Sequence, residues 1–341
     1  MKMALVTGIS GQDGAYLSKL LLEKGYKVIG CDRRTASGSL WRLEELGILS
    51  DIEITDFELA EFTNIYRTIE KYKPDEVYNL ASQSFVGASF EMPMYTSDVT
   101  GMSVIRILES IKSINPSIKF YQASSSEMFG KVKSNSQNEK TPFHPRSPYG
   151  VAKLFGHWAT VNYRESYDIY AVSGILFNHE SPLRGEEFVT RKITKGLCNI
   201  RLGIKDVLEL GNLEAKRDWG FAGDYVEGMW SMLQQEKADD YVLATGENHS
   251  IREFIDITSN KLGFNLIWEG TGVNTVGIDT KTKKTIIKIN PKFYRPAEVD
   301  ELCGDATKAH SILGWKQKTS FMELVEMMTE TDLSRCKKIQ L

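Results

Sequence analysis

A glycine-rich turn near the N-terminus constrains this chain more than any other feature of its sequence. An apolar run from Met3 to Thr7 leads into three glycines, Gly8, Gly11 and Gly14, and an amphipathic stretch follows. Glycines at this spacing let the backbone approach a pyrophosphate closely, and the N-terminus of a following helix stabilises the negative charge. The turn therefore predicts a dinucleotide site formed by Gly8, Ser10, Gly11, Gln12, Asp13 and Gly14.

Short apolar runs alternate with amphipathic segments through the first half of the chain. Their continuous apolar character is typical of parallel strands that are buried on both faces. The expected strands are Met3 to Thr7, Lys27 to Cys31, Glu76 to Leu80, Lys119 to Ser124 and Ile169 to Ile175. The expected fold is therefore α/β, with a Rossmann-type doubly wound parallel sheet.

The alternation weakens after about residue 177, and a chain of 341 residues divides naturally into two packed regions. Residues 178–185 and 270–284 have the composition of loops. We expect residues 1–177, joined by a segment that returns at about 206–245, to form a dinucleotide-binding domain. Residues 178–205 and 246–341 are expected to form a smaller, discontinuous α/β domain for the substrate.

The overall charge of the chain excludes a general attraction for polyanions. The formal net charge is -3 and the pI is about 6.1, so we expect neither nucleic acid nor an anionic membrane as a partner. The cysteines contain no C-x-x-C pair, which argues against a zinc site or a disulfide framework. They are Cys31, Cys198, Cys303 and Cys336. No apolar segment reaches membrane-spanning length, and we expect a cytoplasmic protein without a metal ion.

The end of the second expected strand reads Cys31-Asp32-Arg33-Arg34, and it bears on the choice of cofactor. A carboxylate at this place binds the ribose diol of NAD, whereas an arginine binds the 2′-phosphate of NADP. Two guanidinium groups beside one carboxylate favour NADP, with Arg33 as the phosphate contact. NAD stays open as the less favoured alternative.

Tyr149 and Lys153 are four residues apart, so they share one face if their segment is helical. A lysine ammonium and a positive nicotinamide lower the pKa of a phenol, which can then take the proton of a sugar hydroxyl as its carbon gives up hydride. The spacing alone is common in surface helices. It gains weight because Ser124 to Ser126 end an expected strand, where helper hydroxyls lie in an open parallel sheet.

Glu127 distinguishes this chain from a plain dehydrogenase. If the chain stays extended beyond the strand, residues 125 and 127 point to the same side, into the pocket of Tyr149. Oxidation at C4 of a sugar makes the C5 proton removable, and a carboxylate can take that proton and help water leave from C6. The alternative is that Glu127 caps the next segment or lies in solvent.

These residues fall within longer blocks of sequence. The blocks are Gly8 to Gly14, Tyr78 to Ser84, Tyr121 to Gly130, Ser147 to Tyr149, Phe177 to Pro182, Lys216 to Gly220 and Tyr294 to Asp300. In them the chain resembles the GDP-mannose 4,6-dehydratase family of extended short-chain dehydrogenases/reductases, and the resemblance runs from Met1 to about Arg335.

The resemblance implies a lyase that dehydrates GDP-mannose with a tightly bound NADP, and a homodimer or homotetramer. It implies that the catalytic residues are Ser125, Glu127, Tyr149 and Lys153. The further cofactor contacts that it implies are Arg33, Glu58, Leu59, Leu80, Ala81, Ser82, Gln83, Ser84, Tyr95, Tyr149, Lys153, His179 and Arg184. The implied substrate contacts are Ser84, Ser125, Glu127, Tyr149, Asn178, Val189, Lys192, Gly211, Arg217, Arg295 and Glu298.

Three positions depart from the pattern of the family: Ser125 stands where threonine is usual, Glu58 stands where aspartate is usual, and Asp32 precedes the arginine pair. None of them removes a reacting group. A GDP-manno-heptose remains an alternative substrate. A 4-epimerase or dehydrogenase would not need Glu127, and a non-catalytic NADP-binding regulator would not need the intact set of Ser125, Tyr149 and Lys153.

Overall fold

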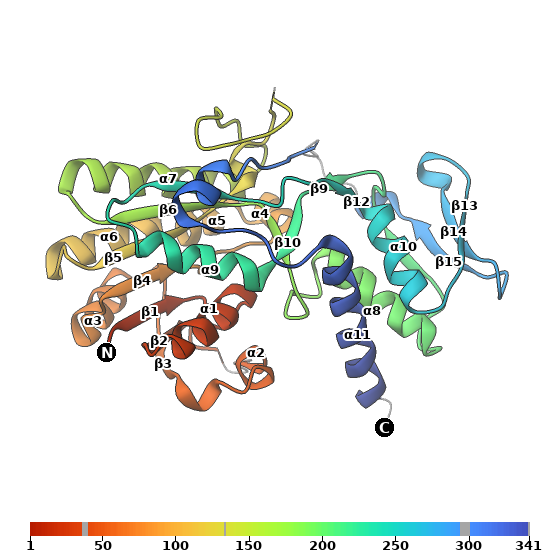
Figure 1. Cartoon of the computed structure of the whole chain (residues 1–341), viewed down its shortest axis with the longest axis horizontal. Helices are drawn as coiled ribbons and strands as arrows, with labels where there is room; N and C mark the ends of the chain where they lie inside the picture. The colour runs from red at the N-terminus through yellow and green to blue at the C-terminus, as the bar shows by residue number, and fades with distance from the viewer. Residues whose placement is uncertain (36–39, 133, 294–300, 340–341) are drawn as a thin grey trace.

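The computed structural model describes residues 1–35, 40–132, 134–293 and 301–339. Its largest element is a seven-stranded sheet with the order β11-β6-β5-β4-β1-β2-β3, in which all neighbours are parallel (Figure 1). The strands are β1 (Met3–Thr7), β2 (Lys27–Asp32), β3 (Glu53–Asp56), β4 (Glu76–Asn79), β5 (Lys119–Ser125), β6 (Ala171–Leu176) and β11 (Asp240–Leu243). This arrangement confirms the predicted Rossmann-type doubly wound sheet.

Helices cover both faces of this sheet, because successive residues of its strands enter two separate hydrophobic cores. Val6 and Tyr78 pack in one core with residues of α1 and α9, whereas their neighbours Leu5 and Val77 pack in the other with residues of α3, α6 and α7. The helices are α1 (Gln12–Glu23), α9 (Ala222–Leu233), α3 (Phe62–Tyr72), α6 (Ser103–Ile114) and α7 (Pro148–Tyr167). Burial on both faces is the reason that the strands are continuously apolar.

The five predicted strands are confirmed, each within two residues at either end. Two strands of the sheet, β3 and β11, lie outside that set. β3 is an edge strand with three of its four residues exposed, so it lacks an apolar run. Three short helices follow β2 and β4: α2 (Trp41–Glu45), α4 (Val86–Glu91) and α5 (Pro93–Thr96).

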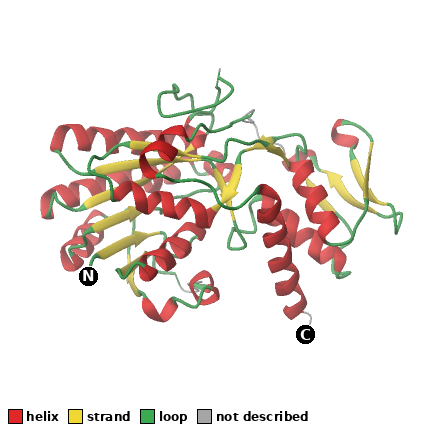
Figure 2. Cartoon of the chain, in the orientation of Figure 1, coloured by secondary structure: helices red, strands yellow, loops and turns green. Residues whose placement is uncertain are grey.

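A smaller unit lies beside the large sheet, with its own four-stranded sheet in the order β13-β14-β15-β8 (Figure 2). Its strands are β8 (Leu208–Leu210), β13 (Leu266–Glu269), β14 (Val276–Asp279) and β15 (Thr285–Ile289). Its helices are α8 (Val189–Arg201), α10 (Ile251–Lys261) and α11 (Phe321–Ile339), which share one hydrophobic core with the sheet. The loop expected at residues 270–284 is wrong in part, because β14 lies inside it and pairs with both neighbours.

The chain passes between the two units several times. Two small pairs mark the crossings, β7 (Asn178–Glu180) with β10 (Trp219–Phe221) and β9 (Lys216–Arg217) with β12 (His249–Ser250). Within the segment 206–245, β8 belongs to the small sheet, and the later part supplies α9 and β11 to the large one. Trp315 also packs in the core of the large unit, and its indole Nε1 donates to Asp224 O at 2.7 Å.

Candidate active site

The glycine turn closes over the end of β1 in a shape that only glycine allows. Gly8 has a φ of 69°, and its N–H donates to Cys31 O at 3.1 Å. A Cβ on Gly14 would lie 2.3 Å from Gly8 O, because the first turn of α1 packs directly on the loop. Gly11 immediately precedes α1, and a Cβ on it would lie 3.1 Å from Gly8 O. The backbone therefore forms a tight cradle at a helix N-terminus, which suits a pyrophosphate.

Gln12 and Asp13, at the start of α1, are bonded to β7 and the loop that follows it. His179 Nε2 lies 2.9 Å from Asp13 Oδ2, and His179 Nδ1 lies 2.8 Å from Phe177 O, which can only accept. Gln12 donates to His179 O at 3.1 Å and accepts from Ser181 Oγ at 2.7 Å. Burial opposes both charges, but the contact outweighs it, so the pKa of Asp13 falls to about 2 and the pKa of His179 is raised.

The segment after β4 forms the neighbouring wall of this site. Leu80 N and Ala81 N each donate to Thr7 Oγ1 at 3.1 Å, and Gln83 N donates to Thr100 Oγ1 at 3.2 Å. Ser82 is half-buried and Ser84 is exposed in the same segment. The predicted positions 80–84 thus lie at the carboxyl edge of the sheet beside the glycine turn, where a Cβ on Gly8 would be 3.0 Å from Ala81 Cα.

Three of the predicted cofactor contacts, Arg33, Glu58 and Leu59, follow β2 and β3, and a fourth, Tyr95, lies in α5. Arg33 Nη1 donates to Tyr95 OH at 3.2 Å, and both side chains are exposed. Asp32 Oδ1 accepts from the backbone N–H of Arg33 at 3.0 Å. Glu58 is exposed and Leu59 is half-buried just beyond β3. The structure therefore brings Arg33 and Tyr95 together, with the carboxylate of Asp32 beside them.

Glu127 reaches the site by a different path from the predicted one. The chain is not extended past β5, because Ser126–Met128 form a turn of 3-10 helix, η3, which Ser125 caps by accepting from Glu127 N at 3.2 Å. The expectation of an extended segment is wrong, since this turn satisfies the Glu127 amide locally. The turn still lies beside Tyr149, because Glu127 O is packed against Gly150 at the start of α7, and Ser125 and Glu127 both shift the pKa of the Tyr149 phenol.

The local sequence places Tyr149 in the first turn of α7. Ser147 caps this helix by accepting from Gly150 N at 3.0 Å, and Pro148 occupies the first helical position. A Cβ on Gly150 would lie 2.8 Å from Glu127 O, so the helix start abuts η3. Burial raises the pKa of Tyr149, and the Glu127 carboxylate adds to this, whereas the hydrogen bond to Ser125 opposes it.

Lys153 lies one turn further along α7 and is buried. Its ammonium donates to Ala123 O at 2.8 Å and lies 5.7 Å from the centre of the Tyr149 ring. Burial lowers the pKa of Lys153 to about 8. The pKa of Tyr149 in this chain is raised and not lowered as predicted, because burial outweighs the other effects on the phenol.

The predicted substrate contacts lie mostly on the small unit or at its border. Lys192 Nζ on α8 lies 3.5 Å from the centre of the Phe293 ring, and a Cβ on Gly211 would lie 2.8 Å from Phe293 O. Arg217 is buried in β9. Asn178 opens β7 and Val189 opens α8. Between them lies Arg184, a predicted cofactor contact, whose Nε is 3.1 Å from Glu180 Oε2. Arg295 and Glu298 lie outside the described residues.

Two contributors to the site were not predicted. Thr7 is expected only as the end of a strand, yet its hydroxyl donates to Asn79 Oδ1 at 2.8 Å and accepts hydrogen bonds from the amides of Leu80 and Ala81. Its place directly before Gly8 was the available signal. Arg42 Nη1 donates to Ser10 O at 2.8 Å, and no local pattern indicates this contact.

The part of the chain that the structure describes offers no candidate metal site, membrane-spanning helix or disulfide. No group of three or more His, Cys, Asp or Glu side chains there could hold a metal ion. No helix within those ranges has the length and apolar character needed to cross a bilayer. The four cysteines are unbridged.

Comparison with known proteins gives the same family from sequence and the same fold from structure. A family model described as GDP-mannose 4,6 dehydratase matches residues 5–328. The chain is 50% identical to GDP-mannose 4,6 dehydratase 1 of Arabidopsis thaliana, covering 99% of this chain and 91% of that protein. It is 49% identical to GDP-mannose 4,6 dehydratase of Homo sapiens, covering 97% and 91%.

Among solved structures, DesIV from Streptomyces venezuelae, a dTDP-glucose 4,6-dehydratase with NAD and TYD bound, has a TM-score of 0.83. It is 19% identical, with 98% of each chain covered, so it shows the shared fold alone. The family model covers nearly the whole chain, and its range includes Ser125, Glu127, Tyr149 and Lys153. The chain therefore belongs to the GDP-mannose 4,6-dehydratase family.

Proposed function

We propose that this protein is a hydro-lyase that converts GDP-mannose to its 4-keto-6-deoxy derivative. The observation that carries the proposal is the convergence of a hydroxyl, a carboxylate and a phenol at the carboxyl edge of the sheet. Ser125 caps the turn that carries Glu127, and Glu127 O lies against the first turn of α7, which carries Tyr149. A simple dehydrogenase or 4-epimerase has no use for that carboxylate.

Tyr149 is the base for the first step, and takes the proton of the C4 hydroxyl while Ser125 holds that oxygen in place. Its burial disfavours a phenolate, so the cation of Lys153 is needed nearby to make proton removal feasible. When bound, NADP supplies the hydride acceptor for C4 and the hydride donor for C6. The sugar is therefore neither oxidised nor reduced overall.

Glu127 is the acid and base for the elimination between C5 and C6. The C4 ketone acidifies the C5 proton, Glu127 takes that proton, and the C6 hydroxyl leaves as water with a proton from the same carboxyl. The proposal is supported by the turn η3, which abuts the start of α7 and so brings Glu127 near Tyr149. When hydride returns to C6, C5 takes up a proton, and the proton that Tyr149 took from the C4 hydroxyl balances it, so one molecule of water is lost for each sugar converted.

The cofactor of this reaction is proposed to be NADP. The cradle in which a Cβ on Gly14 would meet Gly8 O fits a dinucleotide pyrophosphate. Arg33, exposed beside Tyr95, is available to pair with a 2′-phosphate, and the Asp32 carboxylate is already engaged by a backbone N–H. The nucleotide released from purified protein by denaturation distinguishes NADP from NAD by chromatography.

The GDP-sugar is proposed to lie between the two units. Lys192 and Arg217 bring cationic side chains from α8 and β9 to a chain whose net charge is -3, so these local groups supply the attraction for a diphosphate. The large sheet unit then holds the dinucleotide, and the smaller unit holds most of the nucleotide sugar.

We also propose that the chain acts as a homodimer or homotetramer. Three apolar residues on one side of α7 are exposed: Val151 by 54%, Phe155 by 44% and Trp158 by 55%. Met102, at the end of the adjoining π-helical segment η2 (Ser97–Met102), is 42% exposed. Contiguous exposed apolar side chains of this size mark contact surfaces rather than solvent-facing ones.

The decisive experiment incubates the purified protein with GDP-mannose and no added cofactor. Mass spectrometry should show the loss of one water, and a parallel sample with a GDP-manno-heptose measures the preference for the sugar. Formation of a product of unchanged mass would instead indicate a 4-epimerase, and no reaction with bound NADP would indicate a regulator.

A substitution of Glu127 by glutamine tests its assigned role. General acid and base catalysis contributes about 10²–10⁴-fold, so Glu127→Gln should lower the dehydration rate by that factor and still retain the nucleotide. Glu70→Gln, exposed on α3, is the control and should react like the wild type. Wild-type turnover in Glu127→Gln would remove this residue from the mechanism.

A further inference from the structure

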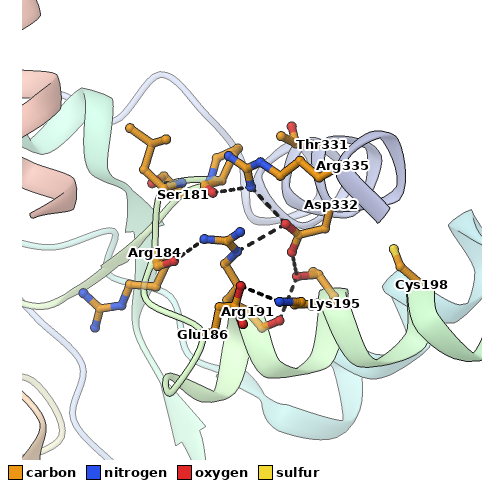
Figure 3. Close-up of polar contacts among 12 residues, drawn as sticks. Ser181, Arg184, Glu186, Arg191, Lys195, Cys198, Thr331, Asp332 and Arg335 are labelled. Carbon is orange, nitrogen blue, oxygen red and sulfur yellow. Dashed lines mark hydrogen bonds and ion pairs between the residues drawn. The ribbon is translucent and has the colours of Figure 1, made fainter. Parts of the chain in front are cut away.

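Three arginines hold the short segment 182–184, which leads from β7 toward α8. Each of its three successive backbone carbonyls accepts a hydrogen bond from a different arginine. The donors are Arg335 Nη1 to Pro182 O at 2.7 Å, Arg42 Nε to Leu183 O at 2.6 Å, and Arg191 Nη1 to Arg184 O at 2.7 Å. We call Arg42, Arg191 and Arg335 the arginine clamp. Figure 3 shows Arg191 on α8 and Arg335 on α11 extending toward this segment.

The arginine clamp joins both units of the molecule to the glycine turn. Arg191 and Arg335 come from helices of the small unit, whereas Arg42 comes from α2, which contacts α1. Arg42 also donates from Nη1 to Ser10 O at 2.8 Å. A single guanidinium therefore ties Leu183 to the loop that forms the pyrophosphate cradle.

Asp332 orients two members of the clamp. Its carboxylate is 2% exposed and accepts from Arg191 Nε at 3.2 Å, from Arg335 Nη1 at 2.9 Å and from Thr194 Oγ1 at 2.7 Å (Figure 3). Arg335 is also paired with Glu45 of α2. The buried carboxylate is thus fully hydrogen-bonded, which is the condition for a stable buried charge.

The indole of Trp41 lies against the guanidinium groups of all three clamp arginines. The guanidinium carbons of Arg191 and Arg335 lie 5.3 and 5.4 Å from the centre of its ring, and that of Arg42 lies 4.6 Å from it. An aromatic face attracts cations, so the three guanidinium groups can gather around one ring despite their like charge.

The position of the clamped segment matters because of what it connects. Ser181, just before it, donates to Gln12 at the start of α1, and Arg184, at its end, is one of the predicted cofactor contacts. Three carbonyls without these donors would have to be satisfied by water in a less defined geometry. The clamp therefore sets where Arg184 begins its approach to the site.

We propose that the arginine clamp consists of positioning residues: it fixes segment 182–184 against the glycine turn and thereby slows release of the dinucleotide. The part of this inference that concerns the dinucleotide rests on the proposed function. Arg42, Arg191 and Arg335 donate to protein carbonyls, so they act through the segment that they hold.

The test compares Arg42→Lys and Arg335→Lys with wild type, since lysine keeps the charge but loses the planar fork that bonds two acceptors at once. Hydrogen exchange is measured by mass spectrometry on cofactor-free protein, in a peptide spanning residues 180–190. Each substitution should speed exchange in this peptide about tenfold, which corresponds to the loss of one charge-assisted hydrogen bond. Glu330→Gln, also on α11, breaks only its surface pair with Lys261 of α10 and should leave the exchange unchanged.

A second measurement follows the release of bound NADP after dilution into excess competing nucleotide. Release should be about tenfold faster in both lysine variants and unchanged in Glu330→Gln. Unchanged exchange in both variants would overturn the clamp, and faster exchange with unchanged release would overturn its positioning role. If Arg335→Lys does not fold, Arg42→Lys gives the same readouts with Asp332 and its partners intact. Wild-type protein that binds no dinucleotide would overturn the proposed function, and the exchange result alone then decides on the clamp.

Discussion

Replacing Asp13 by asparagine removes the charge that pairs with His179, and the structure allows its cost to be worked out. Burial works against the Asp13 carboxylate, yet its pKa falls from 3.8 to about 2 because of His179. At 1.36 kcal/mol per pKa unit this corresponds to about 2.4 kcal/mol of folding free energy. Asparagine keeps the size and a hydrogen bond, so Asp13→Asn should lose about 2 kcal/mol.

The loss should depend on pH in a defined way. Because the pKa of Asp13 is lowered on folding, its stabilisation is present above pH 4 and disappears as the pH falls toward 2. Because the pKa of His179 is raised, its contribution is complete below its ordinary pKa of 6.5 and is lost as the pH rises through the raised value. Asp13→Asn should therefore cost most between about pH 4 and 6.5.

Urea unfolding of the cofactor-free protein, followed by circular dichroism, measures this difference. We expect a loss of about 2 kcal/mol at pH 5.5 and a smaller loss at a pH above the raised pKa of His179, where only a hydrogen bond to the neutral imidazole remains. The double variant with His179→Gln is the control, and it should lose less than the sum of the two single variants. Equal losses at both pH values, or additive ones, would refute the reasoning.

Three further predictions concern the glycine turn, the reacting lysine and the exposed face of α7. Gly14→Ala should destabilise the cofactor-free protein by about 1–3 kcal/mol, because its Cβ would lie 2.3 Å from a backbone oxygen, whereas Gly11→Ala, with 3.1 Å, should cost less in the same thermal unfolding assay. Because burial lowers the pKa of Lys153 to about 8, its cation is lost as the pH rises through that value, so kcat/KM should fall above pH 8, and Lys153→Arg should shift this limb to higher pH. Phe155→Glu should convert the oligomer to a smaller species in sedimentation velocity, and an unchanged sedimentation coefficient would exclude α7 as the contact.

Local features of the sequence predict the large sheet and the turn that follows β1. The strands buried on both faces are continuously apolar, and the turn at Gly8 requires a positive φ, so both leave a clear mark on the sequence. The start of α7 was not predicted, although Ser147 and Pro148 are typical capping residues. The family resemblance then supplied residues, such as Tyr95, that no local pattern indicates.

The features that escaped prediction depend on contacts between distant residues or on local competition. Glu127 was expected on an extended segment, but the hydroxyl of Ser125 captures its amide and turns the chain, which spacing alone does not reveal. The strand β14 is short and partly exposed, and it exists because β13 and β15 pair with it on either side. Arg42 meets a carbonyl 141 positions away in the chain.

The outermost strand β11 has a consequence for how this protein is made. It pairs with β6, which ends at Leu176, but it begins only at Asp240, after α8 and β8 of the other unit have been synthesised. During synthesis, β6 therefore emerges as a strand with an unpaired edge. The apolar side of α1 stays exposed until α9 has been synthesised and covers it. A gene fragment that stops near residue 177 should consequently yield an aggregating product, because the nucleotide-holding half cannot be excised as one uninterrupted piece of chain.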